Sequence, residues 1–230
     1  MKPCLVVNCD IKRFDLVHAC QRRLASLRAN DLINDVLLLL EHPHTFSMGR
    51  SSKPAHLIWD DAERHRRGVA LCEADRGGGV TYHGPGQLVA YPIIKLGKAP
   101  DLHRYLRNLE EALIATLGRL GVSALRVPGL TGVWVGKEKL ASIGVKFARG
   151  VAWHGISINV SCDLSYFDGI IACGLSGFGQ TSLATLGIRA SVEDLGGILI
   201  AELGRVFCFA MDHMVINQAE PGNEIGVESV

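Results

Sequence analysis

The stretch from Arg76 to Pro92 reads RGGGVTYHGPGQLVAYP. It contains three consecutive glycines, a short β-type run that ends in a histidine, a Gly-Pro-Gly break and a second β-type run. Glycine is costly inside regular structure, so such a cluster marks a required turn or a close approach of the main chain to another group. The stretch predicts two strands about this break. By spacing alone, a simple hairpin corner and a wall for an elongated ligand are about equally favoured.

Helical and β-type patterns surround this stretch on both sides. Asp10 and Asp101 can each cap a helix, and Ser191 with Asp194 has the form of a capping box before a last helix. A short polar helix is expected around WDDAERHRRG. We expect strands in CLVVNC (4–9), DVLLLLE (35–41), VALCEAD (69–75), ALRV, GVWV, LASIGVKF and WHGISINV.

These elements form one continuous pattern without a linker or a repeat. The chain is therefore predicted to be a single α/β (α+β) domain, with a mixed, mostly antiparallel sheet flanked by helices. We expect the domain to span residues 1–217 and the polar residues 218–230 to form a flexible tail.

Composition excludes several function classes. The chain has 230 residues, 48% hydrophobic and 20% charged, with a formal net charge of +1. It has no basic footprint for nucleic acid, no membrane-spanning run and no secretory signal pattern. Its seven cysteines form no CxxC pair. We therefore expect a reduced, cytoplasmic protein with free thiols, and neither nucleic acid nor a membrane as partner.

Among the thiols, Cys162 and Cys173 lie in loop-like sequence, whereas the other five lie on apolar faces where cysteine acts as a small hydrophobe. A nucleophilic cysteine needs a neighbour that lowers its pKa or removes its proton. Histidines at 42, 44, 83 and 154 and lysines at 137, 139 and 146 are candidates. Lys139 leads directly into an apolar strand, where partial desolvation would favour a base. His42-Pro-His44 lacks further ligands, so no metal site is expected.

At this point four motifs resemble the lipoyl(octanoyl) transferases: RGGGVTYHGPGQLVAYPI, GVWVGKEKLASIGVKF, WHGISINV and DLSYFDGIIACGLSGFGQTSL. EHPHTFSMGR is also similar to their substrate loop. The resemblance covers about residues 5 to 210 in order. It implies the single-domain fold shared with biotin and lipoate protein ligases, whose central sheet carries a long acyl pocket. The chain departs from the family at Gly79, where a polar residue is common, and at Ala172, where proline is common.

The resemblance also implies residue roles. Cys173 corresponds to the nucleophile that accepts the acyl group. Lys139 corresponds to the lysine that lowers the pKa of this cysteine and shuttles the proton during the reaction. Substrate binding is implied for Arg76, Gly77, Gly78, Gly79, Val80, Thr81, Tyr82, His83, Ser142, Ile143, Gly144, Gly155, Ile156 and Ser157.

The implied reaction is the transfer of an octanoyl or lipoyl group from acyl carrier protein to a lysine of a lipoyl domain, through a thioester on Cys173. The implied acceptors are the lipoyl domains of 2-oxoacid dehydrogenase E2 subunits and the glycine cleavage H protein. No ATP and no cofactor are expected, because one thioester replaces another. The densest basic segment contains Arg50, Lys53, Arg64, Arg66 and Arg67. Two interpretations of this segment remain open: it docks the acidic carrier, or it is only a solvated helix face.

Two other functions stay open. An ATP-dependent lipoate or biotin ligase of the same fold would need no nucleophilic cysteine, so Cys173 with Lys139 argues against it. A catalytically silent protein that binds an acyl group or a carrier would function without acylation of Cys173.

Overall fold

The computed structural model describes residues 1–172 and 179–214. Its elements follow in the order β1 (Lys2–Ile11), α1 (Phe14–Ala29), β2 (Asp35–Glu41), β3 (Thr45–Met48), η1 (Pro54–His56), α2 (Asp61–Arg66), β4 (Ala70–Glu73), β5 (Val80–His83), β6 (Gln87–Lys95), α3 (Leu102–Arg119), β7 (Val133–Val135), β8 (Glu138–Ala148), β9 (Val151–Asn159), η2 (Leu164–Gly169), β10 (Gly179–Gln180), α4 (Val192–Phe207) and β11 (Phe209–Met214). Helices and strands are mixed along the chain, as the sequence pattern predicts.

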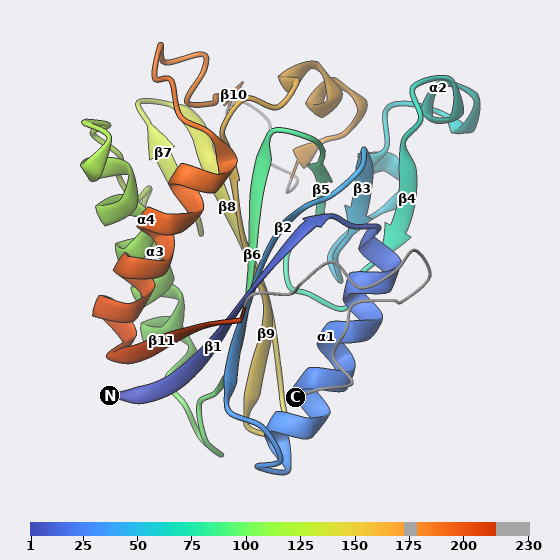
Figure 1. Ribbon diagram of the computed structural model, residues 1–230. Coiled ribbons are helices and arrows are strands. Elements are labelled where there is room, and N and C mark those ends of the chain that lie inside the picture. Colours follow the sequence, from blue (N-terminus) through green and yellow to red (C-terminus); the bar gives the residue numbers. More distant parts are fainter. Residues whose placement is uncertain (173–178, 215–230) are drawn as a thin grey trace.

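The large sheet has eight strands in the order β10-β8-β9-β6-β2-β1-β11, with β7 paired to β8. Its centre is antiparallel, whereas β1 pairs in parallel with β2 and β11, and β10 pairs in parallel with β8. Helices α3 and α4 cover one face of this sheet and α1 covers the other (Figure 1). The prediction of one mixed α/β domain with flanking helices is confirmed.

The Gly-Pro-Gly break is a corner between two sheets. Strand β5 pairs with β3 in a second, three-stranded sheet of order β4-β3-β5, while β6 pairs with β2 and β9 in the large sheet. The small sheet lies beside α2, to one side of the large sheet (Figure 1). Although β5 and β6 are separated by only three residues, they are not hairpin partners. Before this corner, the glycine run lies against β8 of the large sheet, where the N–H of Gly77 donates to the carbonyl of Val145.

Burial follows this layering. The largest apolar cluster lies between the large sheet and helices α3 and α4, and a second lies under α1. A third, smaller cluster joins the small sheet to η2, with Phe46, Tyr82 and Phe167 among its members. No helix in the described ranges is both long enough and apolar enough to cross a bilayer.

Helix ends test the capping predictions. Asp60, Asp101 and Ser191 each accept a backbone hydrogen bond as N-caps of α2, α3 and α4. The expectation that Asp10 caps the first helix is wrong, because β1 continues to Ile11 and α1 begins at Phe14. Pairing of β1 with β2 extends to Ile11, so the strand outcompetes the local capping preference. Strand β11 was not expected from the sequence.

Candidate active site

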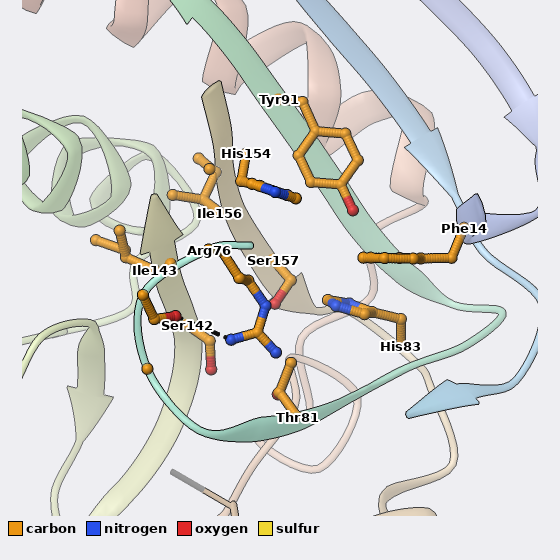
Figure 2. Close-up of a pocket in the computed structure, with 14 residues that line it drawn as sticks. Phe14, Arg76, Thr81, His83, Tyr91, Ser142, Ile143, His154, Ile156 and Ser157 are labelled. Carbon is orange, nitrogen blue, oxygen red and sulfur yellow. Dashed lines mark hydrogen bonds between the residues drawn. The ribbon is translucent and has the colours of Figure 1, made fainter. Parts of the chain in front are cut away.

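A pocket lies where the glycine segment Arg76–Gly79 crosses β8 and β9 (Figure 2). Of the expected substrate-binding residues, those that line it are Arg76, Gly77, Gly78, Thr81, His83, Ser142, Ile143, Gly144, Gly155, Ile156 and Ser157. The three separate motifs of the sequence thus meet at one place, because β8 and β9 pair side by side with Gly144 opposite Gly155.

The remaining expected residues do not line this pocket. Side chains alternate along a strand, so Thr81 and His83 of β5 face the pocket while Val80 and Tyr82 face the small-sheet cluster. Both Val80 and Tyr82 are fully buried there. Gly79 contributes its carbonyl oxygen to Arg76, at 2.9 Å from Nη1.

Arg76 is buried and organises the glycine segment. Its Nη2 donates to the carbonyl oxygen and the hydroxyl of Ser47, at 2.6 and 2.7 Å, and its Nη1 donates to the carbonyls of Gly77 and Gly79. A guanidinium can satisfy several acceptors at once, which stabilises a loop that lacks its own regular hydrogen bonds. Arg76 therefore holds bare backbone in place at the pocket wall.

The glycines allow main chains to approach closely. The N–H of Gly77 donates to the carbonyl of Val145 at 2.8 Å, which fastens the segment to β8. A Cβ atom at Gly144 would meet Arg76 Cδ at 3.1 Å, and one at Gly155 would meet the carbonyl oxygen of Ala90 at 2.3 Å. These positions require glycine for packing, and Gly77, Gly78, Gly144 and Gly155 also line the pocket. The hairpin-corner interpretation of the glycine-rich stretch is wrong, because β5 and β6 pair in different sheets, and the wall for an elongated ligand stays a prediction.

Phe14, Tyr91 and His154 also line the pocket, although none of them was predicted as a substrate-binding residue. Phe14 begins α1 and stacks on the ring of His83 at 5.8 Å. Figure 2 shows the rings of Tyr91 and His154 beside Ile156, on the same side of the pocket. His154 directly precedes the predicted segment Gly155–Ser157, and this adjacency was the signal available in the sequence.

Three histidines near the pocket are held neutral. Burial lowers the pKa of His42 and of His154 to about 4 each. Burial, together with the nearby charges of His42 and Arg76, holds the pKa of His83 well below its ordinary value. A buried imidazole loses its hydration on charging, so the neutral ring is favoured. These side chains act as hydrogen-bonding groups at neutral pH rather than as cations.

A chain of buried hydrogen bonds runs from the glycine segment to β10. The amide oxygen of Gln87 accepts from Nδ1–H of His83 at 2.8 Å, so Nε2 of that ring accepts from the Ser47 hydroxyl at 3.1 Å. Gln87 then donates to Asn159 at 2.9 Å. Asn159 donates to the carbonyl of Thr181, also at 2.9 Å. A buried hydrogen-bonded network of this kind fixes the relative positions of its members.

Lys139 lies on β8, three residues before the pocket-lining segment Ser142–Gly144, and is only 5% exposed. Its Nζ atom lies 5.1 Å from the ring centroid of Trp134. A Cβ atom at Gly132 would approach Cε of Lys139 to 2.7 Å, so the lysine stem depends on glycine there. The expected desolvation of Lys139 is observed.

Cys173 lies outside the residues that the structure describes. The described chain resumes at β10, where Gln180 pairs with Lys139 and the N–H of Thr181 donates to the carbonyl of Lys139 at 3.0 Å. The end of the cysteine-containing motif is thus anchored beside the lysine.

The other cysteines differ in part from expectation. Cys162 was expected to have a fair chance of meeting solvent but is 5% exposed, and burial raises its pKa to about 12. Cys208 was expected on a buried face but is exposed, because it caps the C-terminus of α4 in a left-handed conformation. Burial opposes ionisation of Cys162, so its environment does not favour a thiolate nucleophile.

In the predicted carrier-docking segment, much of the positive charge is paired. Arg64 is buried and donates to Asp61 and to the carbonyl of Trp59, while Arg66 and Arg67 both pair with Glu63. Arg67 also lies over the Trp59 ring at 4.2 Å. These contacts stabilise α2 locally and reduce the positive electrostatic potential at its surface.

Comparisons with known proteins agree with this arrangement. Residues 16–204 match the family model described as the lipoyl protein ligase A/B catalytic domain. An octanoyltransferase of Solibacter usitatus is 46% identical over 89% of this chain and 95% of its own length. One from Chloroflexus aggregans is 50% identical over 81% of this chain and 87% of its own length.

Among solved structures, the bi-partite lipoate protein ligase of Thermoplasma acidophilum superposes with a TM-score of 0.72 at 17% identity, covering 94% of this chain and 88% of its own. At that identity the match shows a shared fold, which is the ligase-type fold expected from the sequence.

Proposed function

Because the chain belongs to the octanoyltransferase family and is an acyltransferase, we propose that it moves an octanoyl group from acyl carrier protein to the ε-amino group of a lysine on a lipoyl domain. The acceptors are the lipoyl domains of 2-oxoacid dehydrogenase E2 subunits and of the glycine cleavage H protein. The observation that carries the proposal is Lys139: a buried lysine beside the pocket wall, whose backbone carbonyl accepts from the N–H of Thr181 near the end of the Cys173 motif.

In the first step the thiolate of Cys173 attacks the thioester carbonyl on the phosphopantetheine arm. A new C–S bond forms, the old one breaks, and the carrier leaves as a thiol after taking up a proton. The acyl group then rests on Cys173 as a thioester. One thioester replaces another, so the step needs neither ATP nor a cofactor. The nucleophile is the thiolate, so a neighbouring cation accelerates this step.

In the second step the lysine amine of the lipoyl domain attacks the acyl-Cys173 thioester. A C–N bond forms, the C–S bond breaks, and the thiolate of Cys173 is restored. Lys139 supplies the proton that the carrier thiol takes up in the first step. In the second step Lys139 accepts the proton of the incoming amine. A partly desolvated lysine suits this role, because burial favours its neutral form.

The acyl chain occupies the pocket between β8, β9 and the glycine segment. Backbone N–H groups in that segment are the candidates for stabilising the oxyanion that forms in each step. Ile143 and Ile156 offer apolar surface to the chain. Burial of the six methylenes and the terminal methyl gains about 0.8 kcal/mol for each carbon, roughly 5–6 kcal/mol in total.

Intact-mass measurement after mixing the purified protein with octanoyl-acyl carrier protein, without ATP, tests the proposal. We expect one octanoyl adduct, confined to Cys173 by peptide mapping and absent from Cys173→Ser. Cys208→Ser is the matched control, because Cys208 is an exposed thiol remote in sequence from the motif. An adduct that requires ATP would support a ligase. Full transfer by Cys173→Ser would refute the covalent intermediate.

A further inference from the structure

Three ligand-type side chains meet beside the pocket without a role in the proposed reaction. His18 of α1, Asp75 before the glycine segment and His154 of β9 place their ligand atoms within 4.8 Å of one another. One Asp75 oxygen lies 3.0 Å from Nε2 of His18 and 2.7 Å from Nε2 of His154. From this juxtaposition we propose that the three residues bind one divalent transition-metal ion, such as Zn²⁺.

The donor set fits this class of ion. Two imidazole nitrogens and one carboxylate oxygen are the protein ligands of many zinc and non-haem iron sites, whereas Mg²⁺ and Ca²⁺ prefer oxygen ligands. Zinc holds such atoms at about 2.0–2.2 Å, so two ligand atoms on a tetrahedral ion are separated by about 3.3 Å. The present separations from Asp75 need to widen by only a few tenths of an ångström. Three protein ligands leave a fourth position open.

The surroundings also allow an ion to enter. His18 lines an open depression between α1 and the β3–β4 edge, which also contains Arg22, Cys72 and Glu73. The side chains of His18 and Asp75 are 17% and 36% exposed, while that of His154 is 1% exposed. The site therefore has two ligands at the surface and one anchored in the core.

His154 is held in this position at a cost. Its backbone adopts φ +58°, a conformation that residues other than glycine seldom take, and its buried Nδ1 has no hydrogen-bond partner within the described ranges. Its backbone N–H donates to Gln21 at 2.9 Å, which fixes the ring opposite α1. Arg76 lines the same pocket as His154, and its charge opposes a cation. We therefore expect weaker affinity than at a site without a cation nearby.

Titration of Zn²⁺ into tag-free, chelator-treated full-length protein, followed by calorimetry, tests the site. One ion should bind per chain, with a rise in melting temperature. His18→Ala and Asp75→Asn should each weaken binding at least tenfold, because the first removes a ligand and the second replaces the carboxylate with a neutral amide. His65→Ala is the matched control, since His65 is exposed on α2 and should leave binding unchanged.

The absorption spectrum of bound Co²⁺ distinguishes this site from a site with thiolate ligands. Co²⁺ in the same protein should give visible ligand-field bands without the near-ultraviolet charge transfer of thiolate ligation, and Cys173→Ser should bind it equally well. Absence of binding up to millimolar Zn²⁺, equal binding by wild type, His18→Ala and Asp75→Asn, or loss of binding in Cys173→Ser would each overturn the proposal. None of these results depends on whether the protein transfers an acyl group.

Discussion

The backbone N–H of Thr181 donates a 3.0 Å hydrogen bond to the carbonyl of Lys139. The carbonyl of Thr181 in turn accepts from the amide of Asn159, at 2.9 Å. Thr181 is thus held from both sides, by the strand that carries the lysine and by the network that begins at the glycine segment.

Asn159→Ala should lower both stability and acyl transfer. The change leaves the amide of Gln87 and the carbonyl of Thr181 without their partner in the core, at a cost of about 1–3 kcal/mol. Chemical denaturation and the rate of octanoyl loading measure the two effects. Asn30→Ala is the control, because the Asn30 amide bonds to Ser26 at the surface. A change no larger than that of the control would show that the network is dispensable.

Gly132→Ala should impair the reaction through Lys139. The new Cβ would lie 2.7 Å from both Cε of Lys139 and the carbonyl oxygen of Ala141, at a residue with φ +131°. Gly129→Ala isolates the contact from the backbone strain, because Gly129 also has a positive φ (+79°) but open space around it. We expect loading to fall at least tenfold in Gly132→Ala and to stay near wild type in Gly129→Ala. Equal rates in the two variants would mean that the lysine position is not sensitive to Gly132.

The free energy of unfolding should fall as the pH is lowered from 6.5 towards 4. His42 has a folded-state pKa of about 4, and that of His83 is also well below normal, so the unfolded chain binds more protons in this interval. Each such histidine contributes up to about 1.4 kcal/mol per pH unit, and this stability is present at higher pH.

Urea denaturation at pH 7, 6 and 5 measures this slope. In His42→Gln the slope should be shallower, while His103→Gln, which alters an exposed residue on α3, should retain the wild-type slope. Constant stability between pH 7 and 5 would contradict the assignment of neutral buried histidines.

Acyl-chain length should control the rate of loading. A butyryl donor has four fewer methylenes than an octanoyl donor, which removes about 3 kcal/mol of burial and slows transfer on the order of 10²-fold. Competition between butyryl- and octanoyl-carrier, followed by mass spectrometry, measures the ratio. Equal incorporation of the two groups would exclude an apolar pocket that holds the chain in the transition state.

Thiol alkylation should discriminate among the cysteines. Cys4 and Cys162 are buried and burial raises the pKa of each to about 12, so neither should react with iodoacetamide in the native protein at pH 7.5. Cys208 is exposed and should react slowly. We expect Cys173 to react fastest, and prior octanoylation should protect it. Protection of Cys208 instead would show that Cys208 carries the acyl group, which would contradict the role of Cys173.

The local pattern of the sequence determined most of the helices and strands. Caps at Asp101 and Ser191 marked helix starts, because short-range chemistry sets these features. The pocket segments around Ser142 and Gly155 were predicted from the resemblance of their motifs to a known family. Strand alternation, also a local property, separates Thr81 and His83 from Val80 and Tyr82, but which side faces the pocket depends on the sheet that β5 joins.

Only the tertiary structure decided that β5 and β6 belong to different sheets, that Cys162 is buried, and that His18, Asp75 and His154 converge. These three side chains come from positions up to 136 residues apart, and no spacing rule links them. Strand order and helix docking are set by burial of apolar faces summed over the whole core, so contacts of this kind arise from the packed chain and not from any one stretch of it.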